Sequence, residues 1–89
     1  MKKIYRRTVT EKVESLSVNT EFLTDENCIA VVDSFIRDMT EGSIPFNAVA
    51  QAIEINASVQ TPKFSIKIEK IKDEIILHIY KNVHSYCVD

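Results

Sequence analysis

The chain has little glycine, few cysteines and no tryptophan: of its 89 residues, one is Gly, two are Pro, two are Cys and none is Trp. A single glycine excludes any conventional glycine-rich phosphate-binding loop. Two cysteines, Cys28 and Cys87, are too few for a disulfide framework, so we expect free thiols. No apolar run approaches the roughly 18 residues that a membrane span needs, and no apolar segment follows the basic N-terminus as in a signal peptide. We therefore expect a cytoplasmic protein without membrane contact.

The residues that are present are those of an ordered globular domain. Hydrophobic residues make up 45% of the chain and charged residues 27%, unlike a disordered or low-complexity sequence. A chain of this length forms one domain with one modest core. Since no linker, internal repeat or charge run divides it, we expect residues 1–89 to fold as a single small domain.

Residues 4–18 have the composition of a long strand, because Thr, Val and Tyr favour pleated surfaces. The apolar residues change parity between Val13 and Leu16, which predicts a bulge near Glu14 or Ser15. Helical spacing remains an alternative for the same apolar residues, but the Ser, Thr and Val content favours the strand.

Two helices are predicted next. Apolar residues at every third or fourth position indicate a first helix over residues 25–41, with Thr24 as its N-cap. Gly42 follows the last apolar turn, where a left-handed residue would end the helix. Pro45 suits the first turn of a second helix, which has a narrower apolar stripe. The two stripes comprise Cys28, Val31, Val32, Phe35, Ile36 and Met39, and then Phe46, Val49, Ala50 and Ile53.

Residues 63–80 alternate between apolar and polar as the two arms of a hairpin do, with a turn at residues 70–73. The resulting register pairs Phe64 with Ile79, Ile66 with Leu77, and Ile68 with Ile75. It also places Glu69 opposite Glu74, an unfavourable like-charge pair.

The order strand, helix, helix, strand, strand predicts an α+β two-layer fold. We expect a three-stranded antiparallel sheet in the order 1-3-2, with two helices on one face. The predicted core comprises Val9, Val13, Val32, Phe35, Ile36, Val49, Ile53, Phe64, Ile66, Ile68, Ile75, Leu77 and Ile79.

Residues 75–87, IILHIYKNVHSYC, hold both histidines and one cysteine and invite a metal or nucleophile interpretation. In an unbroken strand His78 and His84 lie roughly 20 Å apart, and Cys87 points to the face opposite His84. No H-E-x-x-H, G-x-S-x-G or EF-hand pattern occurs either. We expect no metal, no cofactor and no enzymatic activity.

Charge is divided along the chain. Residues 1–12 hold five bases and one acid, a net charge of +4, whereas residues 13–60 hold eight acids and Arg37, a net charge of −7. The sheet is therefore expected to be basic and the helical layer acidic. The sheet face turned away from the helices is predicted to carry Arg6, Thr8, Thr10, Lys12, Ser65, Lys67, Ile76, His78 and Tyr80.

These features predict a small non-enzymatic protein-binding module, a homodimer, that acts by occupying a partner protein's surface. Ile76 and Tyr80 make the predicted open face more apolar than an idle face requires. The expected contact residues are Arg6, Thr8, Lys12, Lys67, Ile76, His78 and Tyr80. Such small, motif-poor domains are common among accessory and inhibitor proteins of phages and mobile elements. The alternative is a regulatory module that binds nucleic acid through the basic sheet face.

Overall fold

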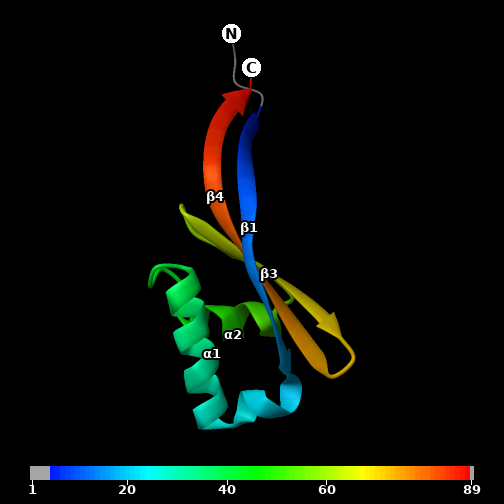
Figure 1. Cartoon of the computed structure of the whole chain (residues 1–89). Helices are drawn as coiled ribbons and strands as arrows, with labels where there is room; N and C mark the ends of the chain where they lie inside the picture. Colours follow the sequence, from blue (N-terminus) through cyan, green and yellow to red (C-terminus); the bar gives the residue numbers. More distant parts are fainter. Residues whose placement is uncertain (1–4, 89) are drawn as a thin grey trace.

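The computed structural model describes the backbone of residues 5–88 and the side chains of residues 9–83. It is an α+β protein in which two helices pack against one face of an antiparallel sheet (Figure 1). The elements, in chain order, are β1 (Tyr5–Asn19), a 3₁₀ helix η1 (Thr20–Thr24), α1 (Glu26–Met39), α2 (Phe46–Glu54), β2 (Val59–Gln60), β3 (Phe64–Ile71) and β4 (Glu74–Val88).

Within the described residues the sheet has four strands in the order β1-β4-β3-β2, so the prediction of three strands in the order 1-3-2 is wrong. The additional strand, β2, pairs Val59 with Ile66 and Gln60 with Ser65. Two residues are too few to show an alternating pattern, and Pro62 follows closely, so the sequence carries no strand signal there. β2 forms because β3 offers it an open edge.

The hairpin of β3 and β4 has a tighter turn than predicted. Only Lys72 and Asp73 lie between the strands, and Ile66 pairs with Ile79. The predicted register is therefore wrong by two residues, which leaves every side chain on its expected face. Lys72 adopts a left-handed φ of 53° without being a glycine, so no turn signal marks the position. The shift also removes the predicted contact between like charges, because Glu69 lies opposite Ile76.

β1 pairs with β4 along its whole length, with register shifts between Lys12 and Glu14 and between Val9 and Thr10. The first shift is the bulge that the change of apolar parity predicts, one residue earlier than expected. Beyond Asn82, which donates its N–H to the Lys63 carbonyl at 2.7 Å, β4 pairs with β1 alone. We call this two-stranded segment, residues 5–10 and 82–88, the arm.

The ends of α1 differ by one residue from the predicted ones. The N-cap is Asp25 rather than Thr24, and its carboxylate accepts the Asn27 N–H at 2.8 Å. At the other end Gly42 is left-handed as predicted, but the residue directly after the C-cap, Glu41, is also left-handed, with φ 54°. The Gly42 N–H then donates to the Arg37 carbonyl at 2.7 Å, the pattern of a Schellman motif.

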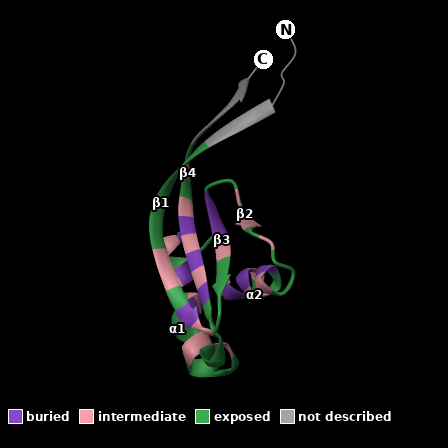
Figure 2. Cartoon of the chain, turned by 90° about the vertical axis from the view of Figure 1, so that its right-hand side faces the viewer, coloured by how far each residue is buried: buried purple, intermediate pink, exposed green. Residues whose placement is uncertain are grey.

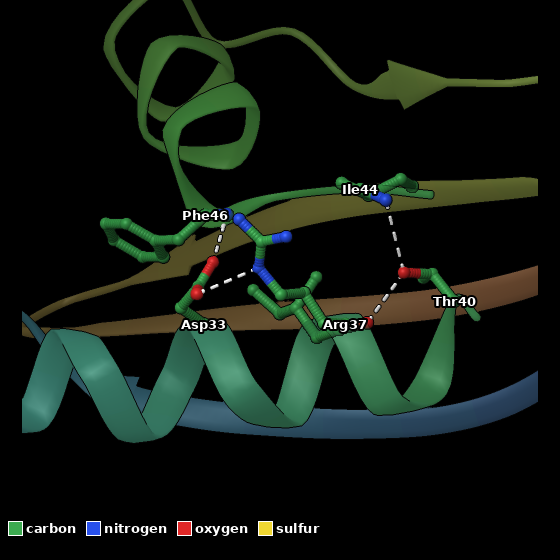
Figure 3. Close-up of polar contacts among 6 residues, drawn as sticks. Asp33, Arg37, Thr40, Ile44 and Phe46 are labelled. Carbon is green, nitrogen blue, oxygen red and sulfur yellow. Dashed lines mark hydrogen bonds and ion pairs between the residues drawn. The ribbon is translucent and has the colours of Figure 1, made fainter. Parts of the chain in front are cut away.

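One carboxylate joins the two helices (Figure 3). Asp33 Oδ1 accepts the N–H of Phe46, the first residue of α2, at 2.8 Å, and Asp33 Oδ2 accepts from Arg37 Nε at 2.9 Å. Pro45, predicted in the first turn, is instead the N-cap and makes no side-chain cap bond. Asp33 therefore supplies to α2 the capping acceptor that Pro45 lacks.

The core lies between the helices and the sheet, where buried residues concentrate (Figure 2). Its fully buried apolar side chains are Ile36, Ile44, Val49, Ile66, Leu77 and Ile79. Two predicted core residues are exposed: Val9 by 45% and Val13 by 42%. Val9 lies in the arm, beyond the last residue of β4 that pairs with β3, and Val13 is the bulged residue between Lys12 and Glu14, which has no pairing partner in β4. Phe35, Ile53 and Ile68 are only partly buried.

The molecule is elongated, with extents of 53 × 26 × 18 Å and a radius of gyration of 14.7 Å, against about 12 Å for a compact chain of this length. The arm accounts for the length, because it projects past the body at the end opposite η1 (Figure 1).

Candidate functional site: the open face of the sheet

The face of the sheet opposite the helices carries side chains in three cross-strand rows. Residues directly opposite each other in an antiparallel sheet share a face, so the pairing places them in order. The rows run β1, β4, β3 and consist of Lys12, Tyr80 and Ser65; Ser15, His78 and Lys67; and Ser17, Ile76 and Glu69. We call these nine residues the open face.

A chain of hydrogen bonds crosses the open face through His78. Ser15 Oγ lies 3.0 Å from His78 Nδ1, and His78 Nε2 lies 3.1 Å from Glu69 Oε1. The three residues come from three adjacent strands. Both ring nitrogens are therefore engaged, which holds the imidazole in one orientation.

The apolar and aromatic side chains of the open face lie along β4, and Tyr80 also contacts a residue of a neighbouring strand. Ile76, His78 and Tyr80 follow one another along β4 and are all half-buried. Lys67 Nζ lies 5.4 Å from the centre of the Tyr80 ring, within the range of a cation–π contact. Tyr80 therefore lies between two lysines: Lys67 on β3 and Lys12, its pairing partner on β1.

Ser15, His78 and Glu69, linked in that order by hydrogen bonds, contain the three residue types of a nucleophilic triad but not its geometry. In a serine hydrolase, the histidine Nε2 takes the proton and backbone N–H groups stabilise the oxyanion. Here Nδ1 faces the serine, and the Ser15 N–H donates to Glu14 Oε1 at 3.0 Å. The arrangement therefore differs from a serine hydrolase triad in the ring nitrogen that faces the serine and in the Ser15 N–H, which already donates to a side chain.

Five of the seven sequence-predicted contact residues come together on the open face: Lys12, Lys67, Ile76, His78 and Tyr80. The other two, Arg6 and Thr8, lie in the arm opposite Cys87 and Ser85, and their side chains are outside the described part, as are those of His84 and Cys87. Ser15, Ser17 and Glu69 were missed. The predicted bulge in β1 was the signal that could have identified Ser15 and Ser17. The bulge reverses which residues of β1 face the helices, and so it turns these two serines to the open face.

A second surface feature lies on the helical side, beside the edge strand β1. It is a groove of about 630 Å³, which we call the edge groove. Val31 and Phe22 on its wall are 70% and 52% exposed. Its lining comprises Leu16, Ser17, Val18, Asn19, Phe22, Asn27, Cys28, Val31, Val32 and Glu74.

Among residues 9–83, no three His, Cys, Asp or Glu side chains gather closely enough to hold a metal ion. None of the helices that the structure describes has the length and apolar character needed to cross a membrane.

Fold and surface together define a small α+β domain with an ordered open sheet face, an apolar edge groove and a projecting arm. In comparisons with known proteins, no family model, no curated protein and no solved structure matched the chain.

Proposed function

We propose that the protein is a non-enzymatic protein-association module that occupies a partner protein's surface with its open face. The observation that carries this proposal is the half-buried strip of Ile76, His78 and Tyr80 on β4. Glu69 and Lys67 on the neighbouring strand contact His78 and Tyr80, respectively. An apolar and aromatic centre with a polar rim is the usual composition of a protein interface.

Side chains that are already ordered in the free protein favour binding. Immobilising a long side chain at an interface costs about 0.5–1.5 kcal/mol, and a side chain that is already held avoids much of this cost. His78 has partners on both ring nitrogens and Tyr80 is packed beside Lys67. Aromatic residues in such settings contribute most to affinity.

Nucleic acid is the second candidate partner. Lys67 over the Tyr80 ring, with Lys12 opposite, is an arrangement that could contact phosphate while a base stacks on the ring. The major groove of DNA also admits a two-stranded ribbon such as the arm. Glu69 on the same face and the net charge of −2 oppose this reading.

The test compares Tyr80→Ala and Ile76→Asp with Ile55→Asp, which changes a residue that is 72% exposed at the end of α2. Tagged wild-type protein is first used to capture a partner from nuclease-treated lysate, and affinity for that purified partner is then measured. We expect each open-face variant to lose about tenfold or more in affinity, which corresponds to about 1.4 kcal/mol. The Ile55 variant should bind as the wild type does.

Unchanged affinity in both open-face variants would contradict the proposal. If capture disappears on nuclease treatment, and binding to an oligonucleotide weakens steeply with salt and with Lys67→Ala, the nucleic-acid candidate is correct instead.

A further inference from the structure

We propose that the edge groove is filled by a second copy of this chain, whose arm strand, residues 5–13 of β1, lies antiparallel beside β1. The inference goes beyond the proposed function, because it concerns a different surface, which lies on the helical side and at the β1 edge of the sheet.

β1 has an open edge. It is the outermost strand of the sheet, so one side of its backbone faces no other strand within residues 5–88. An unpaired edge accepts a further strand. An added strand would place its helix-side side chains beside Leu16 and Val18 of β1. These side chains would also contact Phe22 and Val31, which belong to the apolar surface of the groove.

The charge of the groove is complementary to that of the arm strand. Glu74 is the one charged residue among those that line the groove, and residues 16–32, which supply the rest of the lining, contain three acids and no Lys, Arg or His. An apolar groove with acidic residues nearby suits a basic, partly apolar strand. Residues 5–13 have this composition, with Arg6, Arg7 and Lys12 against Glu11, a net charge of +2, and with Tyr5, Val9 and Val13 among them. The chain thus contains a segment complementary to its own groove.

The arm also lacks a third strand. An isolated two-stranded ribbon is marginally stable in water, and a third strand is usually needed. Within the described residues the arm consists of β1 and β4, and its Val9 and Val83 are 45% and 57% exposed. A β1 strand from a second copy would give each arm a third strand and cover this apolar surface.

The geometry allows the contact to be reciprocal. The arm lies at one end of the 53 Å molecule, and the edge groove lies at the other end, beside η1 and the start of α1 (Figure 1). When two copies lie antiparallel, each arm reaches the other's groove. This arrangement is a closed two-fold dimer, and it joins the two open faces in one continuous sheet.

The first experiment measures mass by light scattering over a range of concentrations. The wild type is expected to reach twice the chain mass of 10.2 kDa, whereas Val31→Asp and Val9→Asp should shift the mass towards one chain. Ile55→Asp and Tyr80→Ala should leave the dimer intact. Circular dichroism checks that the exposed substitutions keep the fold. A wild type that stays monomeric throughout would overturn the inference, as would a dimer that only Tyr80→Ala dissociates.

The second experiment uses Cys28, which lines the groove. Val9→Cys with Cys87→Ser should give an interchain disulfide between Cys28 and the new thiol on mild oxidation, identified by peptide mass mapping. Ile55→Cys with Cys87→Ser, which places the thiol at an exposed residue far from the contact, should give none. A dimer without the Cys28 link would overturn the inference. Val31→Asp and Val9→Asp leave the open face unchanged, so a wild type that stays monomeric yet binds its partner through the open face would refute the dimer and leave the proposed function standing. A dimer that forms as expected, while Tyr80→Ala and Ile76→Asp bind the partner as the wild type does, would refute the proposed function alone.

Discussion

Asp33 shows how much one side chain does in a domain of this size. Its carboxylate forms an ion pair with Arg37 within α1 and accepts the Phe46 N–H at the start of α2. The pKa of its carboxyl lies below the ordinary value, chiefly because the Phe46 N–H donates to the carboxylate; burial acts in the opposite direction, and the Arg37 guanidinium adds to the lowering. The charged form is therefore the one that holds the two helices together.

This shift predicts a dependence of stability on pH. Because the folded pKa is lower than the unfolded value of about 3.9, the carboxylate stabilises the fold above that value, and the stabilisation is lost as pH falls through the folded pKa. Asp33→Asn keeps an oxygen for the Phe46 N–H but cannot ionise. Urea unfolding should show the wild type to be the more stable protein at pH 7, and the difference should shrink towards pH 2. Asp38→Asn, an exposed acid on the same helix, serves as the control; a difference independent of pH would contradict the assignment.

At the scale of elements, both helices end in the same way. In α1, Gly42 donates to the Arg37 carbonyl, and in α2, Ala57 donates to the Ala52 carbonyl at 2.9 Å. In each case the residue before the donor is left-handed: Glu41 and Asn56 both have φ 54°. Asparagine tolerates this conformation, but glutamate does not do so readily. α1 therefore ends on a strained residue while glycine occupies the next position.

Glu41→Gly is expected to raise the free energy of unfolding. A non-glycine residue pays about 1–2 kcal/mol in the left-handed region, and the greater freedom of glycine in the unfolded chain offsets about 0.4–1 kcal/mol, which leaves a gain of about 0.5–1 kcal/mol. Glu54→Gly, the same substitution at the last helical residue of α2, should lower stability by roughly 0.5 kcal/mol. Chemical denaturation measures both changes. Equal effects at the two positions would show that backbone strain at Glu41 is not the cause.

The whole molecule departs from a compact shape because β1 and β4 are 15 residues long while β3 has 8. The body is a two-layer domain with a buried core, whereas Val9 and Val83, in the part of the arm whose side chains are described, are exposed. An elongated shape exposes more surface for a given volume than a compact one, and the proposed association would bury part of that surface.

The elongated shape can be measured in solution. The Val31→Asp variant, expected to be monomeric, should give by small-angle X-ray scattering a radius of gyration near 14.7 Å or slightly above, not the roughly 12 Å of a compact chain. Wild-type protein should give a larger value that rises with concentration as dimers form. A compact value for the monomer would mean that the arm folds back onto the body when it has no partner strand.

The sequence by itself determined the elements whose signals are local. The apolar stripe over residues 25–41 places α1, because every third or fourth residue must face a core. The alternation in residues 64–68 and 75–79 sets which faces of β3 and β4 are buried, and the change of parity in β1 marks the bulge. Each of these signals lies within about a dozen neighbouring residues, so no knowledge of the partner element was needed.

The tertiary structure alone decided the features that depend on distant segments. β2 exists because β3 has an edge to offer, and the two-residue turn at Lys72 is imposed by strand pairing against the local preference of lysine. Ser15 is 63 residues from His78 along the chain, and Glu69 is 9 residues from His78, yet the three side chains meet on one face. The edge groove likewise forms only where α1 packs beside β1. Long-range pairing brings these side chains together, and no local pattern encodes it.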